Sequence, residues 1–131
     1  MTINSEVRYA SSPEDAKRYD TAELRRRYLI ENVFSADEVN MTYTMHDRMI
    51  AGGAMPVGEI LELKPIDILR ADYFLERREM GIFNVGGKGI VTAGDKEYEL
   101  DYKEALYLGR GSRKVTFRSL APANPSNFDV G

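Results

Sequence analysis

Four consecutive charged residues, Glu76, Arg77, Arg78 and Glu79, are the stretch of this sequence best suited to chemistry. On a β-strand, side chains alternate between faces, so Glu76 would lie beside Arg78 and Arg77 beside Glu79. One interpretation is structural, with each pair forming an ion pair within the chain or between subunits. The other is functional: Arg77 or Arg78 holds the carboxylate of an anionic ligand by a bidentate contact, which makes these arginines the substrate-binding candidates. The two glutamates are not an acid/base pair, because their odd spacing sends them to opposite faces.

The charged block leads into a run of short β-prone segments separated by glycines. The expected strands are residues 80–85, 90–93, 96–102, 105–108 and 115–117. Gly94 and Asp95 form a two-residue loop of the kind that closes a hairpin. Short strands at this even spacing predict an all-β fold, an antiparallel barrel or jelly roll.

Three glycine-rich stretches interrupt the apolar segments. Residues 86–89 and 109–111 do not match the GxGxxG pattern, and no helical pattern follows them, whereas a phosphate-binding loop needs a helix N-terminus behind it. We interpret both as hairpin turns. Gly52 and Gly53 lie inside another β-like run and indicate a bulge, a sharp bend or a close backbone approach.

The upstream part of the chain contains one clear strand and one clear helix start. Residues 39–45 alternate between apolar and polar types, which predicts a half-buried strand. Asp20 and Glu23 fit a capping box, which predicts one short helix ending near residue 31 or 32. Residues 1–19 form an N-terminal arm, either extended or a strand that crosses to a neighbouring subunit. Residues 20–131 are expected to form a single domain.

Several segments together resemble one known family. They are the sequences at residues 47–50 (DRMI), 52–56 (GGAMP), 73–81 (YFLERREMG), 84–87 (NVGG) and 105–109 (ALYLG). Through them, nearly the whole chain resembles the N-terminal half of 5-keto-4-deoxyuronate isomerase, the 4-deoxy-L-threo-5-hexosulose-uronate ketol-isomerase of pectin and uronate degradation. The resemblance implies that residues 20–131 are a cupin-type β-barrel, the N-terminal half of a two-cupin protein.

The same resemblance implies an activity for the full-length protein. It would interconvert 5-dehydro-4-deoxy-D-glucuronate and 3-deoxy-D-glycero-2,5-hexodiulosonate by moving a proton between adjacent carbons through an enediol. The zinc-binding residues would belong to the C-terminal cupin half, which this half would contact within a homo-oligomer. With one histidine, His46, and no cysteine, this chain cannot supply a three-histidine metal site. We therefore expect no metal, cofactor or catalytic residue here, an inactive isolated chain, and a surface or half-buried strand position for His46.

Composition limits the alternatives. Besides the isomerase, two other functions are considered. One is a stand-alone, metal-free cupin that acts as a sugar-acid-binding or oligomerisation module, and the other is a sugar-binding sensor domain. The 18 basic and 21 acidic residues give a net charge of −3, which disfavours a nucleic-acid partner. Neither a signal peptide nor an apolar run long enough for a membrane helix is recognisable, so a soluble cytoplasmic protein is the default expectation.

Overall fold

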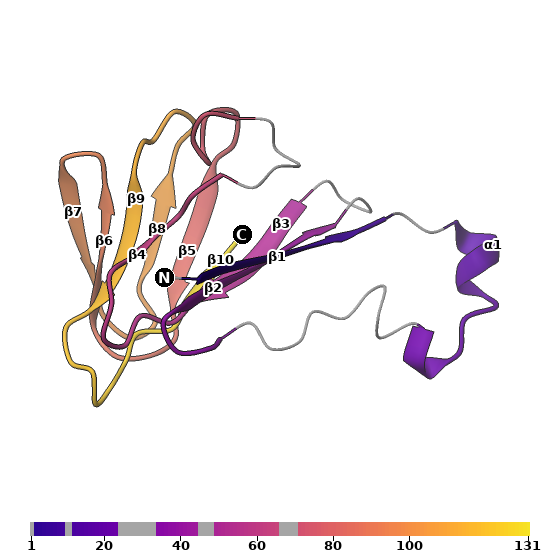
Figure 1. The fold of residues 1–131 in the computed structure, drawn as a ribbon, viewed down its shortest axis with the longest axis horizontal. Coiled ribbons are helices and arrows are strands. Elements are labelled where there is room, and N and C mark those ends of the chain that lie inside the picture. The colour runs from indigo at the N-terminus through magenta and orange to yellow at the C-terminus, as the bar shows by residue number, and fades with distance from the viewer. Residues whose placement is uncertain (1, 10–11, 24–33, 45–48, 66–70) are drawn as a thin grey trace.

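Two β-sheets face each other in the computed structural model, which describes residues 2–9, 12–23, 34–44, 49–65 and 71–131 (Figure 1). The six-stranded sheet has the order β1-β2-β3-β10-β5-β8. Its strands are β1 (Thr2–Arg8), β2 (Glu38–Thr44), β3 (Met49–Ala54), β10 (Phe128–Val130), β5 (Met80–Asn84) and β8 (Ala105–Leu108). The four-stranded sheet has the order β4-β9-β6-β7. Its strands are β4 (Leu61–Glu62), β9 (Val115–Ser119), β6 (Gly89–Ala93) and β7 (Lys96–Leu100).

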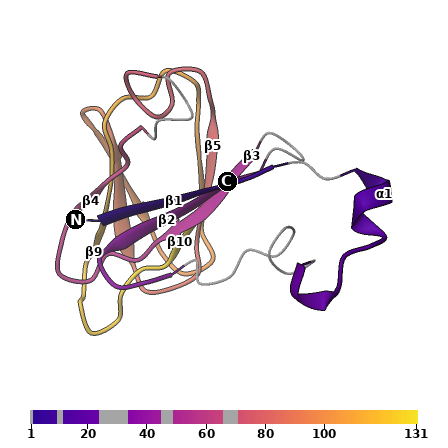
Figure 2. The same cartoon turned by 45° about the vertical axis from the view of Figure 1, so that its right-hand side comes forward.

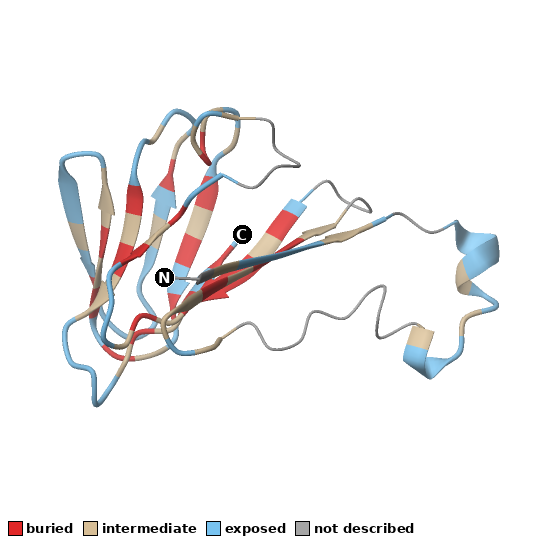
Figure 3. Cartoon of the chain, in the orientation of Figure 1, coloured by how far each residue is buried: buried red, intermediate tan, exposed pale blue. Residues whose placement is uncertain are grey.

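The hydrophobic core lies between these sheets. Alternate residues of β5, β6, β9 and β10 are buried, and the bands in Figure 3 show this pattern clearly on β5, because successive side chains point to opposite faces. Ile82 of β5 and Val91 of β6 are fully buried from opposite sides, and the Phe117 and Phe128 rings pack with centroids 5.4 Å apart. The predicted all-β fold is confirmed. The sheets do not close into a barrel, and β1 runs parallel to β2, whereas the other pairs of named strands are antiparallel.

The N-terminal segment forms strand β1, which pairs within a sheet of its own chain. It then leads to α1 (Pro13–Ala16), which lies away from both sheets (Figures 1 and 2). The Ser12 hydroxyl caps α1 by accepting from the Asp15 N–H at 3.1 Å. The predicted cap at Asp20 is confirmed, since its carboxylate accepts from the Glu23 N–H at 2.8 Å and helical backbone begins at residue 21. The remainder of the predicted helix, from residue 24, lies outside the described residues.

The glycine pair in β3 marks a close backbone approach. The register of β2 and β3 runs without interruption from Val39 opposite Ala54 to Thr44 opposite Met49, so there is no bulge. A Cβ atom added to Gly52 would lie 2.1 Å from the Asn40 carbonyl oxygen. Glycine is therefore the residue that lets β3 pack here.

The other glycine stretches divide into one confirmed hairpin and two connections between sheets. Gly94 has φ of +63° and closes the β6–β7 hairpin, as predicted. Residues 86–89, however, carry the chain from β5 in one sheet to β6 in the other, and residues 109–111 carry it from β8 to β9. The prediction that both were hairpin turns is wrong. Residues 86–87 instead need glycine because a Cβ on Gly87 would lie 2.0 Å from the Asn124 carbonyl oxygen.

Candidate functional site

The charged block lies in a loop immediately before β5. The expectation that it forms a strand is wrong, since β5 begins at Met80. A turn precedes it, in which the Glu76 N–H donates to the Tyr73 carbonyl at 3.2 Å. Phe74 and Leu75 are buried, and the Leu75 carbonyl accepts from the Gly111 N–H at 2.7 Å. These contacts fix the charged loop beside the β8–β9 connection.

Within the block, each glutamate accepts a hydrogen bond from a residue outside the block. Glu76 accepts from the Asp72 N–H at 2.9 Å, and Glu79 accepts from the Tyr107 hydroxyl. No ion pair among the described residues joins a glutamate of the block to either arginine of the block. The predicted pairing of strand neighbours is thus not found, although exposure does alternate: Glu76 and Arg78 are half-buried, and the other two are exposed. A loop that bends does not keep side chains two residues apart in contact.

Arg78 lies over an aromatic ring from another strand. Its guanidinium carbon is 5.2 Å from the centroid of the Tyr43 ring on β2. A cation at that distance from a ring face is attracted by the ring's quadrupole and keeps its charge. The contact therefore holds Arg78 at the end of the large sheet, where its side chain lines both neighbouring hollows.

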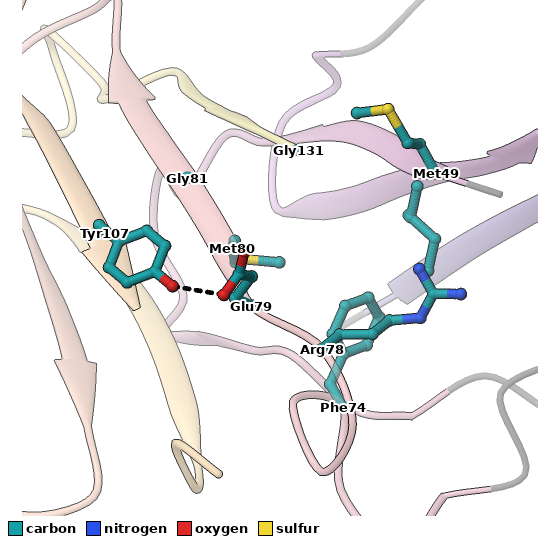
Figure 4. Close-up of a pocket in the computed structure, with 9 residues that line it drawn as sticks. Met49, Phe74, Arg78, Glu79, Met80, Gly81, Tyr107 and Gly131 are labelled. Atoms are coloured by element: carbon teal, nitrogen blue, oxygen red, sulfur yellow. Dashed lines mark hydrogen bonds between the residues drawn. The ribbon is translucent and has the colours of Figure 1, made fainter. Parts of the chain in front are cut away.

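Glu79 contacts a tyrosine of the neighbouring strand β8. Its carboxylate accepts from the Tyr107 hydroxyl at 2.5 Å, across the edge where Gly81 of β5 pairs with Tyr107 of β8 (Figure 4). This hydrogen bond raises the pKa of Tyr107, because the phenol must give up the proton that it donates; Arg110 acts in the opposite direction. Tyr107 therefore stays protonated at neutral pH and acts as a donor.

Arg77, Arg78, Glu79 and Arg110 together line a polar hollow of about 430 Å³. Three guanidinium groups against one carboxylate leave the hollow with a positive charge. Arginine presents a planar set of N–H donors that matches a carboxylate, so the chemistry that this arrangement supports is the binding of an anion. Both sequence candidates are in this hollow. Sequence analysis missed Arg110, which is 32 positions from Arg78 and is brought there by the pairing of β8 with β5.

A second cavity, of about 320 Å³, adjoins the charged hollow and lies between β3 and β5 (Figure 4). Its walls are mainly apolar, with Arg78 and Glu79 shared between the two. The lining residues are Met49, Ile50, Phe74, Arg78, Glu79, Met80, Gly81, Tyr107 and Gly131.

Metal-ligating side chains do not gather in the part of the chain that the structure describes. No group of three His, Cys, Asp or Glu side chains there could hold a metal ion. His46 lies outside the described residues, and the sequence has no second histidine. The described residues thus do not fit a zinc site of the three-histidine type. In the same part of the chain, no helix is long and apolar enough to cross a membrane.

Comparison with curated proteins confirms the resemblance seen in the sequence, although no protein-family model matches the chain. The chain is 65% identical over 128 residues to a 4-deoxy-L-threo-5-hexosulose-uronate ketol-isomerase of Bacteroides fragilis, a match that covers 98% of this chain and 46% of that protein. It is 62% identical to ketol-isomerase 1 of Bacteroides thetaiotaomicron over the same shares of the two chains. With the Lachnoclostridium phytofermentans enzyme, identity is 46% over 95% of this chain and 45% of the relative. The chain spans about half the length of the curated relatives it matches.

Comparison with solved structures finds cupin proteins at low similarity. A cupin-2 domain protein from Shewanella frigidimarina gives a TM-score of 0.44 at 9% identity, covering 62% of this chain and 66% of that one. A cupin protein from Bacteroides fragilis gives a TM-score of 0.44 at 16% identity, covering 66% and 70%.

Proposed function

We propose that this chain forms one half of a 4-deoxy-L-threo-5-hexosulose-uronate ketol-isomerase. The observation that carries the proposal is 65% identity across 98% of the chain to proteins of that name. In this proposal the whole protein interconverts 5-dehydro-4-deoxy-D-glucuronate and 3-deoxy-D-glycero-2,5-hexodiulosonate. The reaction transfers a proton between neighbouring carbons and requires an acid/base group close to them.

In this proposal, the catalytic zinc and its ligands belong to the other half of the protein. The support is the ligand inventory: one histidine and no cysteine in this sequence, and no cluster of three candidate ligands among the described residues. This half then acts on the substrate without a metal of its own.

The contribution of this half is to hold the substrate's carboxylate. A uronate carries one negative charge, and the hollow of Arg77, Arg78 and Arg110 offers a positive surface next to the Tyr107 hydroxyl, which donates to Glu79. Exposed ion pairs contribute only about 0–1 kcal/mol each. Three such contacts give an affinity weaker than millimolar, which corresponds to about 4 kcal/mol. The hollow therefore orients a substrate whose reacting carbons lie in the other half.

Assembly and location complete the proposal. Several large apolar side chains are exposed on this half, among them Phe83 at 54% and Tyr107 at 64%, and they suit contact with the other half or with further subunits of a homo-oligomer. A cytoplasmic location agrees with a cysteine-free sequence but rests on that alone.

A chimera tests the function. In the Bacteroides fragilis relative, the region that this chain matches is replaced by residues 1–131, and isomerisation of the keto-deoxyuronate is followed by NMR. We expect activity in the chimera and none in the 131-residue chain alone. The opposite pattern, a folded but inactive chimera or an active isolated chain, would refute the proposal.

The alternative function is a stand-alone, metal-free sugar-acid-binding or oligomerisation module, which the ligand inventory equally supports. The two are separated by the reading frame. A frame that continues past Gly131 into a segment with an HxH motif, a glutamate and a later histidine favours the isomerase. A frame that stops there favours the module.

A further inference from the structure

The cavity between β3 and β5 has the form of an unoccupied strand position. β10 runs between these strands and pairs Val130 with Gly52 on one side and with Ile82 on the other. Gly131 then exchanges two backbone hydrogen bonds with Gly81, at 2.8 and 3.0 Å. Beyond that point, both flanking chains continue, but no strand among the described residues lies between them.

The register fixes what each further position would face. Partners on β3 and on β5 decrease by one for each step along β10. The first residue joined to Gly131 would therefore lie opposite Ile50 and Met80, and the second opposite Met49 and Glu79. These four residues all line the cavity of about 320 Å³.

Backbone hydrogen-bonding groups point into the cavity from both sides. In an antiparallel pair, residues that exchange hydrogen bonds alternate with residues that do not. Gly131 bonds to Gly81 on the β5 side, so the next bonding residue of that chain is Glu79. On the β3 side the bonding residue is Ile50, which is buried at 6% exposure. An added strand would therefore pair with the backbone N–H and C=O groups of Ile50 on one side and of Glu79 on the other.

We propose that an extended segment joined to the carboxyl end of Gly131 fills this cavity by continuing β10 between β3 and β5. β10 itself supplies the direction, because Gly131, the residue that follows it, lines the cavity (Figure 4). A strand from a separate chain would have to abut the end of β10. The chain spans 46% of the Bacteroides fragilis relative, so that protein contains further chain outside the matched region. The inference goes beyond the proposed function and does not depend on catalysis.

The walls also define the chemistry of the segment. Phe128 and Val130 point into the core while Asp129 is exposed, so the first joined residue faces inward, toward Phe74 and Met80, and is apolar. The second faces outward beside the Glu79 carboxylate, and is basic. An apolar–basic alternation is thus the pattern that fits.

Hydrogen exchange measured by NMR tests the proposal. One chain carries the added residues valine-lysine-valine-threonine after Gly131, and a matched control carries proline at the first two of these positions, which cannot donate a backbone hydrogen bond. We expect the Ile50 and Glu79 amides to exchange at least about ten-fold more slowly in the first chain than in the 131-residue protein, and no slowing in the proline control. The amide of Val91, in the opposite sheet, serves as a reference for global stability.

Three results would overturn the proposal. The first is equal exchange of Ile50 and Glu79 in both extended chains. The second is slowing of Val91 by the same factor, which would mean a general gain in stability. The third is equal protection by the same four residues supplied as a free peptide, which would assign the cavity to a strand from a separate molecule.

Discussion

Replacing Asn84 by aspartate should destabilise the fold strongly and in a pH-dependent way. Asn84 is fully buried at the end of β5. Its amide nitrogen donates to the Gly87 carbonyl at 2.8 Å and to the Leu100 carbonyl at 2.9 Å, and its side-chain oxygen accepts from the Gly86 N–H at 3.0 Å. The side chain therefore ties the connection between the two sheets to the end of β7.

The size of the expected loss in stability follows from these three hydrogen bonds. Asn84→Asp removes two donors, which costs about 1 kcal/mol each, and points a carboxyl oxygen at two carbonyl oxygens. Burial and these oxygens raise the pKa of the new carboxyl above its unfolded value of about 3.9. Below about pH 4 the carboxyl is protonated in both the folded and the unfolded protein, so its ionisation does not affect stability. As pH rises from there toward the folded pKa, the free energy of unfolding falls by about 1.4 kcal/mol per pH unit. We expect a loss of about 2 kcal/mol at pH 4 and of at least about 4 kcal/mol at pH 7.

Urea denaturation followed by circular dichroism at the two pH values measures both losses. The control is Asn124→Asp, the same substitution at an exposed loop position, which should change stability by less than about 0.5 kcal/mol. The reasoning is refuted by an Asn84→Asp protein that is as stable as the wild type at pH 7, or by a loss that is equal at both pH values.

Three further predictions concern single contacts. Gly87→Ala should cost on the order of 3 kcal/mol in urea denaturation, because its Cβ would lie 2.0 Å from the Asn124 carbonyl oxygen, whereas Gly109→Ala meets nothing within 4 Å and should change little. Asp37 accepts from the backbone N–H groups of Val57, Gly58 and Glu59, which lowers the pKa of its carboxyl. Asp37→Asn should therefore cost about 1–2 kcal/mol at pH 7, a difference that disappears as pH falls below about 4; a pH-independent difference would contradict this. Glu79→Ala should let Tyr107 ionise at lower pH, seen as earlier phenolate absorbance that is absent when Tyr107→Phe is added.

Local patterns in the sequence were sufficient for several elements, but not for β1, which lies in the segment predicted as an arm. The alternation in β2, the β6–β7 hairpin at Gly94 and the Asp20 cap depend on residues close together in the chain, and each is found. The glycines at residues 86–89 gave the wrong connection, because a crossing between sheets and a hairpin use the same residue type. What decides between them is contact with residues 124–127, which sequence spacing does not reveal.

For the charged block, too, sequence spacing predicted only part of what the structure shows. Its arginines were identified as anion ligands from their type, and the structure brings both to one hollow. The third arginine, Arg110, is brought to the hollow by the pairing of β5 with β8. In the sequence it lies between two glycines in a predicted turn, and nothing there indicates a role in binding. The block itself is a loop because Phe74 and Leu75 are anchored in the core before β5 begins.

The measurement that tests the account most directly is kcat/KM of the chimera carrying Arg77→Ala, Arg78→Ala and Arg110→Ala together. The matched control is Arg18→Ala, which removes an exposed arginine of the N-terminal segment. Loss of three contacts of up to about 1 kcal/mol each predicts a fall of about ten- to one-hundred-fold in kcat/KM, with the control unchanged. A triple variant as active as the control would contradict the claim that this half holds the substrate's carboxylate.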